Sequence, residues 1–168
     1  MSLSIHSISV PIFASMLSNM SHVLSKAEAW ATERKIDPAV LLNDRLAPDM
    51  FTLKRQVQIA TDHAKGAAAR LGGVEVPSFA DTEESFADLQ ARIAKVRDFV
   101  LSVPQSGFEG AESRDIVLKV GGQDMTFPGA HYLQGFAFPN FYFHMTSAYA
   151  ILRHNGVPLG KGDFFGRG

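Results

Sequence analysis

Apolar side chains recur at alternating steps of three and four over most of this chain, which is the spacing of one face of an α-helix. The first series runs from Val10 to Ala31. Pro11 should either open the regular helix or kink it, because a proline cannot donate a hydrogen bond to the preceding turn. Asp37-Pro38 is typical of a cap followed by proline at the first helical position, and it predicts a short helix through Leu42.

Two further long helices follow. One is predicted over residues 52–71, where Gly72-Gly73 ends it. The next is predicted to be capped by Asp81, with Glu84 three residues later completing a pattern similar to a capping box. Its apolar series continues to Val103, directly before a proline.

The apolar spacing changes to two around Gly121-Gly122, over residues 116–127. Two short alternating runs joined by such a pair predict a β-hairpin. A fourth helix is predicted over residues 129–155, with a break near Pro139. We therefore expect residues 1–168 to form a single all-α domain, a four-helix bundle with a small β-hairpin before the last helix.

Composition excludes several classes of function. The 168 residues include 16 basic and 17 acidic side chains with no basic cluster, which argues against nucleic acid as a partner. No run of about 18 apolar residues is present and no signal peptide begins the chain, so we expect a cytoplasmic protein with no membrane segment. With no cysteine, thiol chemistry would require a bound small molecule.

His144 carries the most informative chemistry. On a helical wheel, Phe141 and Ala148 share its side within about 80°, whereas Arg153 lies opposite, so the imidazole should point into the interior. Asn140 is its neighbour one turn earlier. Polar pairs at this spacing inside bundles build metal sites. The same geometry also suits a core histidine that bonds to its own surroundings, and both interpretations stay open.

His63 lies on the flank of its helix's apolar stripe, about 80° from the centre. An inward orientation is plausible there, beside Gln56. His131 could line a pocket mouth or lie on the surface. His22 is expected to face solvent, and His154 is expected to be structural, near the end of its helix.

An aromatic cluster surrounds the candidate site. It could hold an apolar small-molecule ligand. A bundle core or a dimer interface needs the same side chains, and this interpretation is favoured. The many apolar residues, with 13 phenylalanines, predict a homodimer. The cluster comprises Phe136, Phe138, Phe141, Tyr142 and Phe143.

The segments Asn140-Phe-Tyr-Phe-His144 and Ala148 to Gly156 resemble the last helix of the DinB/YfiT-like superfamily, and most closely its branch called domain-of-unknown-function family nineteen-ninety-three. The segments Leu53 to Val57 and Asp62 to Lys65 support the resemblance, which covers essentially the whole chain. It implies a four-helix bundle, often dimeric. It also implies a divalent metal held by one histidine of the second helix and a His-x-x-x-His pair of the fourth.

Carried across, this resemblance makes His144 the second histidine of the pair and His63 the second-helix ligand. Position 140 departs from the pattern, because Asn140 stands where the family has histidine. An amide oxygen is a weak, hard ligand, so the replacement should weaken the binding of zinc or nickel. His131 and Asp62 could compensate in principle, although Asp62 projects about 100° away from His63.

We therefore predict a polar pocket between the second and fourth long helices, with His63, His144 and Asn140 as divalent-metal ligands. The family resemblance implies a thiol-dependent transferase or hydrolase, although no catalytic residue can be assigned from the sequence. The alternative is a non-catalytic dimeric binding or scaffold bundle with a degraded metal site. Whether the protein is an enzyme stays open at this point.

Overall fold

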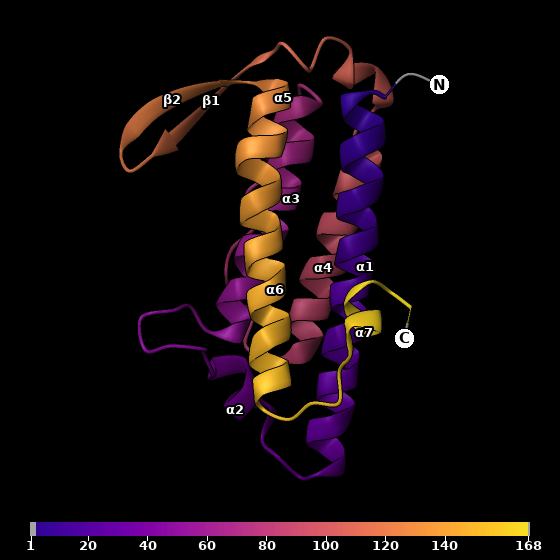
Figure 1. The fold of residues 1–168 in the computed structure, drawn as a ribbon, viewed down its shortest axis with the longest axis vertical. Coiled ribbons are helices and arrows are strands. Elements are labelled where there is room, and N and C mark those ends of the chain that lie inside the picture. The colour runs from indigo at the N-terminus through magenta and orange to yellow at the C-terminus, as the bar shows by residue number, and fades with distance from the viewer. Residues whose placement is uncertain (1–2, 168) are drawn as a thin grey trace.

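The computed structural model describes residues 3–167 and is predominantly helical, with one antiparallel two-stranded sheet in that range (Figure 1). The four long helices are α1 (Ile5–Glu33), α3 (Leu53–Leu71), α4 (Phe86–Ser102) and α6 (Phe138–His154). The shorter elements are α2 (Pro38–Asn43), the 3-10 turn η1 (Gln105–Phe108), β1 (Asp115–Val120), β2 (Gln123–Pro128), α5 (Gly129–His131), the π-helical η2 (Tyr132–Ala137) and α7 (Lys161–Phe164). The long helices run side by side, as Figure 1 shows.

Helix α1 begins five residues earlier than its apolar series suggested. Ser4 caps it, accepting a hydrogen bond from the Ser7 amide while the Ser7 hydroxyl accepts from the Ser4 amide. Pro11 therefore lies inside the helix and does not open it. Both Ser7 and Pro11 are exposed, so water can reach the Ser7 carbonyl that the proline leaves without its usual donor.

The predicted start of α4 is wrong by four residues. The capping box is formed by Ser85 and Asp88, and the helix begins at Phe86. Asp81 is instead 3.0 Å from the Arg92 guanidinium, and Glu84 is 2.6 Å from the Lys54 amine. Arg92 belongs to α4 itself and Lys54 to α3, so side-chain cations, and not the backbone amides of the α4 N-terminus, bind the two carboxylates.

The β-hairpin occurs where the change of spacing predicts it. Ile116 pairs with Phe127, and the register continues to the Gly121-Gly122 turn. Both glycines have positive φ, 59° and 84°, as a two-residue type I′ turn requires. Ile116 is buried against the helices, and Figure 1 shows the hairpin extending sideways beside α5.

The last helical segment is not one regular helix. Residues Tyr132–Ala137 form a π-helix between α5 and α6, and Pro139 is the second residue of α6. The predicted break is therefore a widened turn directly before the proline. Because a proline cannot donate to the carbonyl four residues earlier, the regular hydrogen-bond ladder is interrupted at this point.

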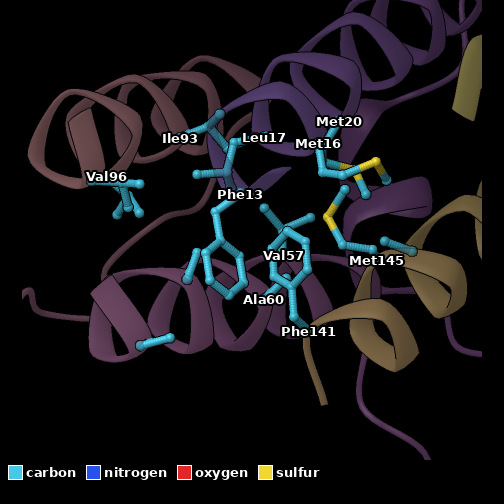
Figure 2. Packing of buried hydrophobic residues seen from close by; sticks show 14 of the residues in the cluster. Phe13, Met16, Leu17, Met20, Val57, Ala60, Ile93, Val96, Phe141 and Met145 are labelled. Atoms are coloured by element: carbon cyan, nitrogen blue, oxygen red, sulfur yellow. The ribbon is translucent and has the colours of Figure 1, made fainter. Parts of the chain in front are cut away.

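The core lies along the axis of the long helices and draws on all four of them. Figure 2 shows Phe13 of α1, Val57 of α3, Ile93 of α4 and Phe141 of α6 packed together. The Phe13 and Phe141 rings meet edge to face at 5.0 Å between centroids. In residues 3–167, no helix is both long and apolar enough to cross a membrane.

Candidate functional site

His144 is buried on α6 and its ring orientation is fixed by Gln56 of α3. The His144 Nδ1 atom lies 2.7 Å from the Gln56 Oε1 atom. The Gln56 Nε2 atom donates to the Phe51 carbonyl at 3.2 Å, which establishes which end of the amide faces the histidine. Nδ1 must therefore carry the proton and donate it to Gln56, and Nε2 keeps its lone pair.

His63 of α3 faces His144 across the gap between the two helices. The ring centroids are 5.8 Å apart and the ring planes differ by 13°. Burial, together with the nearby His144 and Arg70, lowers the pKa of His63 from 6.5 to about 4, although Asp62 opposes the shift. Burial and the Arg55 charge also lower the pKa of His144. Both imidazoles are consequently neutral at neutral pH.

Asn140 is half-buried one turn before His144. Its Nδ2 atom donates to the Phe136 carbonyl at 2.8 Å. Phe136 belongs to the π-helical turn, so this amide satisfies a backbone carbonyl at the point where the regular ladder changes. The bond leaves the Asn140 Oδ1 atom as the side chain's remaining polar group.

The two histidines gain no third strong ligand from the described chain. Within residues 3–167, no group of three or more His, Cys, Asp or Glu side chains is placed to hold a metal ion. Asp62 bonds elsewhere, since its Oδ1 atom lies 2.9 Å from Arg92 and 2.8 Å from Lys65. The residues therefore fit a metal only in part, with two imidazoles and one amide.

The remaining candidate histidines lie away from this pair. His131 is exposed and stacks on Phe127 at 6.0 Å between ring centroids. His22 is partly exposed, as expected, and its Nε2 atom lies 3.4 Å from Asp163. His154 is exposed at the last residue of α6.

The aromatic cluster divides between the core and the surface. Phe141 is fully buried, whereas Phe143 is 55% exposed and its ring meets His144 edge to face. Phe136 packs against His63, with ring centroids 5.9 Å apart. The π-helical turn thus brings an aromatic side chain onto His63.

A small cavity beside His63 was not predicted. It has a volume of about 240 Å³ and lies between α3, β1 and η2. Arg70 and the Tyr132 hydroxyl face each other there at 3.4 Å. It is lined by Asp62, His63, Arg70, Leu118, Lys119, Tyr132 and Phe136. Helical spacing could have placed Arg70 near His63, but the hairpin and π-turn side of the cavity has no local sequence signal.

Arg92 of α4 is a buried polar residue that was also missed. Its guanidinium bonds to Thr61 at 2.7 Å, to Asp62 at 2.9 Å and to Glu83 at 3.0 Å. The signal was present in the sequence, because Arg92 stands in the apolar series of α4 at three residues after Leu89. A charged residue in such a series requires buried partners.

The structure and the sequence both resemble known proteins. A crystal structure of a DinB family member protein from Shewanella denitrificans is 42% identical, covers 95% of this chain and 90% of that chain, and has a TM-score of 0.88. The molecule is therefore DinB-like. Residues 5–165 match the family described as "Domain of unknown function (DUF1993)", and the chain belongs to that family. No curated protein matches the chain.

Proposed function

We propose that this protein is a four-helix bundle of the DinB/YfiT-like type that binds a divalent metal ion through His63 and His144, with Asn140 as a weak third ligand. The observation that carries the proposal is the pair of neutral imidazoles, whose ring centroids lie 5.8 Å apart. A neutral imidazole is a good ligand for zinc or nickel, and protons compete little for nitrogens whose pKa is lowered.

Gln56 supports this assignment. Ligating histidines almost always donate their other ring N–H to an oxygen, which fixes the tautomer and orients the ring. The Gln56 Oε1 atom does this for His144 at 2.7 Å. Such a bond leaves Nε2 as the ligating atom and limits the rotation of the ring.

The proposed metal site would have open coordination positions. With at most three protein ligands, the ion could also bind water or a substrate. A bound ion would supply Lewis-acid chemistry or lower the pKa of a bound water or thiol. We propose thiol-dependent transfer or hydrolysis as the reaction class, by resemblance to the superfamily. The family match and the structural relative do not favour the alternative of a non-catalytic scaffold.

Metal titration of untagged, chelator-treated protein tests the proposal. We expect zinc or nickel to bind by calorimetry, and His144→Ala to abolish binding because it removes the oriented imidazole. Asn140→His should strengthen binding by about tenfold or more, since a third imidazole replaces an amide.

His154→Ala is the matched control, because it removes an exposed histidine from the same helix. It should leave the affinity unchanged. An affinity that stays the same in both His144→Ala and Asn140→His would show that the metal binds elsewhere. A complete lack of binding by the Asn140→His variant would also contradict the proposal.

A further inference from the structure

We propose that the cavity beside His63 is a binding site for a small organic anion, whose carboxylate or phosphate group is held by Arg70 and Tyr132. The cavity shares His63 with the proposed metal ligands, whereas neither His144 nor Asn140 lines it. It lies between α3, β1 and the π-helical turn. His63 forms the boundary that it shares with the imidazole pair.

Arg70 is the main reason for assigning an anion. Its side chain is half-buried, and among the described residues no carboxylate lies within 4.0 Å of its guanidinium. The Arg70 Nη1 atom donates one long side-chain hydrogen bond, to the Tyr132 hydroxyl at 3.4 Å. A guanidinium has five N–H donors in a planar fork that matches carboxylate and phosphate oxygens, so most of these donors are free to bind a ligand.

Gly66 makes room for this arrangement. A Cβ atom at position 66 would lie 2.4 Å from the Arg70 Nη1 atom, one helical turn further along α3. The missing side chain lets the guanidinium lie back over the helix surface. The glycine at position 66 therefore permits the observed position of the Arg70 side chain over α3.

Tyr132 adds a buried donor to the same lining. It is 1% exposed, and burial raises the pKa of its hydroxyl above the usual 10, although Arg70 opposes the shift. The hydroxyl therefore stays protonated at neutral pH. A phenol O–H and a guanidinium that converge on one space are suitable partners for a single anionic group.

The other charges of the cavity do not cancel Arg70. Asp62 also lines the wall, but its Oδ1 atom is already bonded to Arg92 and to Lys65. Lys119 of β1 contributes a second cation, partly offset by Asp124, which is its partner across the hairpin. The cavity is therefore positively charged on the side of Arg70.

The volume and the remaining walls define the ligand class. About 240 Å³ is smaller than the roughly 300–1,000 Å³ of pockets for drug-sized ligands, so the occupant is a small molecule. Leu118 and Phe136 add apolar surface to the lining, and the Phe136 ring packs on the rings of both Tyr132 and His63. A compact carboxylate or phosphate ester with a flat apolar body suits this mixed lining.

The test compares charged and neutral probes of equal shape on metal-free protein. Benzoate and phenyl phosphate represent the two anionic groups, and benzamide is the neutral counterpart of benzoate. We expect amide resonances around Arg70 and Tyr132 to shift with benzoate or phenyl phosphate and not with benzamide. Whichever anion binds more tightly identifies the preferred group.

Two substitutions remove the proposed contact by different routes. Arg70→Gln removes the charge, and Gly66→Ala displaces the guanidinium without changing it. Each should weaken anion binding by at least about tenfold, as expected for the loss of charged hydrogen bonds. Arg153→Gln is the control, because it removes an exposed arginine from α6 and should leave the affinity unchanged.

Equal binding of benzoate and benzamide would overturn the proposal, and so would an affinity that Arg70→Gln leaves unaltered. A lack of any anion binding tighter than about 10 mM would overturn it as well. His144→Ala should leave anion binding intact, since His144 does not line the cavity. A failure of the metal proposal and a failure of the anion proposal are therefore separate results.

Discussion

The side-chain amide of Gln56 decides which nitrogen of His144 carries the proton. Its oxygen accepts a hydrogen bond from His144 and its nitrogen donates one to the Phe51 carbonyl. The amide group therefore cannot flip without losing these bonds. The sequence placed Gln56 near His63 but gave no indication of this role. Its partner is 88 residues away, and a bond across that separation depends on how α3 and α6 pack.

The two histidines illustrate what helical spacing can predict for single residues. Spacing indicated that His144 points inward, and it is buried. It also allowed an inward His63, and the two rings meet. Asn140 could not be predicted in the same way, because its bond to Phe136 depends on the π-helical turn. A single wide turn changes the angular positions of the residues around it.

The lowered pKa of His63 predicts how stability depends on pH. In the unfolded chain this imidazole protonates near pH 6.5, whereas in the folded protein it does so at about 4. The unfolded state therefore binds more protons between these values, and stability falls as pH falls through that interval. Each pH unit in this interval lowers the free energy of unfolding by at most about 1.4 kcal/mol, so the total loss of stability is at most about 3 kcal/mol.

Urea unfolding at pH 7 and pH 4.5 measures this effect. The His63→Gln variant should show a smaller loss of stability on acidification than the unmodified protein, because its side chain does not titrate. An equal loss in both proteins would show that His63 is protonated as easily in the folded state as in the unfolded one.

At the scale of elements, periodic segments were predicted well and their connections were not. The range 52–71 agrees closely with α3, and the Gly-Gly turn located the hairpin, since both signals are local. The start of α4 was missed because ion pairs with Arg92 and Lys54 take the carboxylates that resemble caps. Local capping patterns cannot show that these carboxylates bind side chains farther along the chain.

Arg92 joins α4 to α3 and to the irregular segment before it. Replacing it with leucine leaves Glu83 and Asp62 facing a site without its positive charge, and breaking a buried ion pair in this way costs about 3–5 kcal/mol. We therefore expect Arg92→Leu to lower the free energy of unfolding by about 3 kcal/mol, measured by urea denaturation.

Arg97→Leu is the control on the same helix. Its side chain is 43% exposed and its ion pair with Asp98 is long, at 3.7 Å, so the change should cost less than about 1 kcal/mol. Equal losses in the two variants would contradict the assignment of Arg92 as the residue that holds this segment to the helices.

At the scale of the whole molecule, association stays a prediction. Phe143 is 55% exposed and Leu46 is 40% exposed, and both line one shallow apolar groove with Tyr142. Exposed apolar groups that lie together favour contact between protein surfaces. We expect a homodimer that uses this side of α6.

Light scattering at micromolar concentration measures the mass directly. The unmodified protein should give twice the mass of the chain, and Phe143→Glu should give a single chain because it places a charge in the interface. Val117→Glu, at an exposed position on the hairpin, should leave the dimer intact. A monomeric mass for the unmodified protein would show that the prediction is wrong.

The Gly121-Gly122 turn also has a practical use in protein engineering. A Cβ atom at either glycine would meet nothing within 4 Å, and the turn is carried on a hairpin that extends away from the helices (Figure 1). Near the C-terminus, in contrast, Asp163 of α7 forms an ion pair with Lys26 of α1 at 2.7 Å. An affinity tag or a fluorescent label inserted between the two glycines would therefore disturb the helices less than one fused beyond α7.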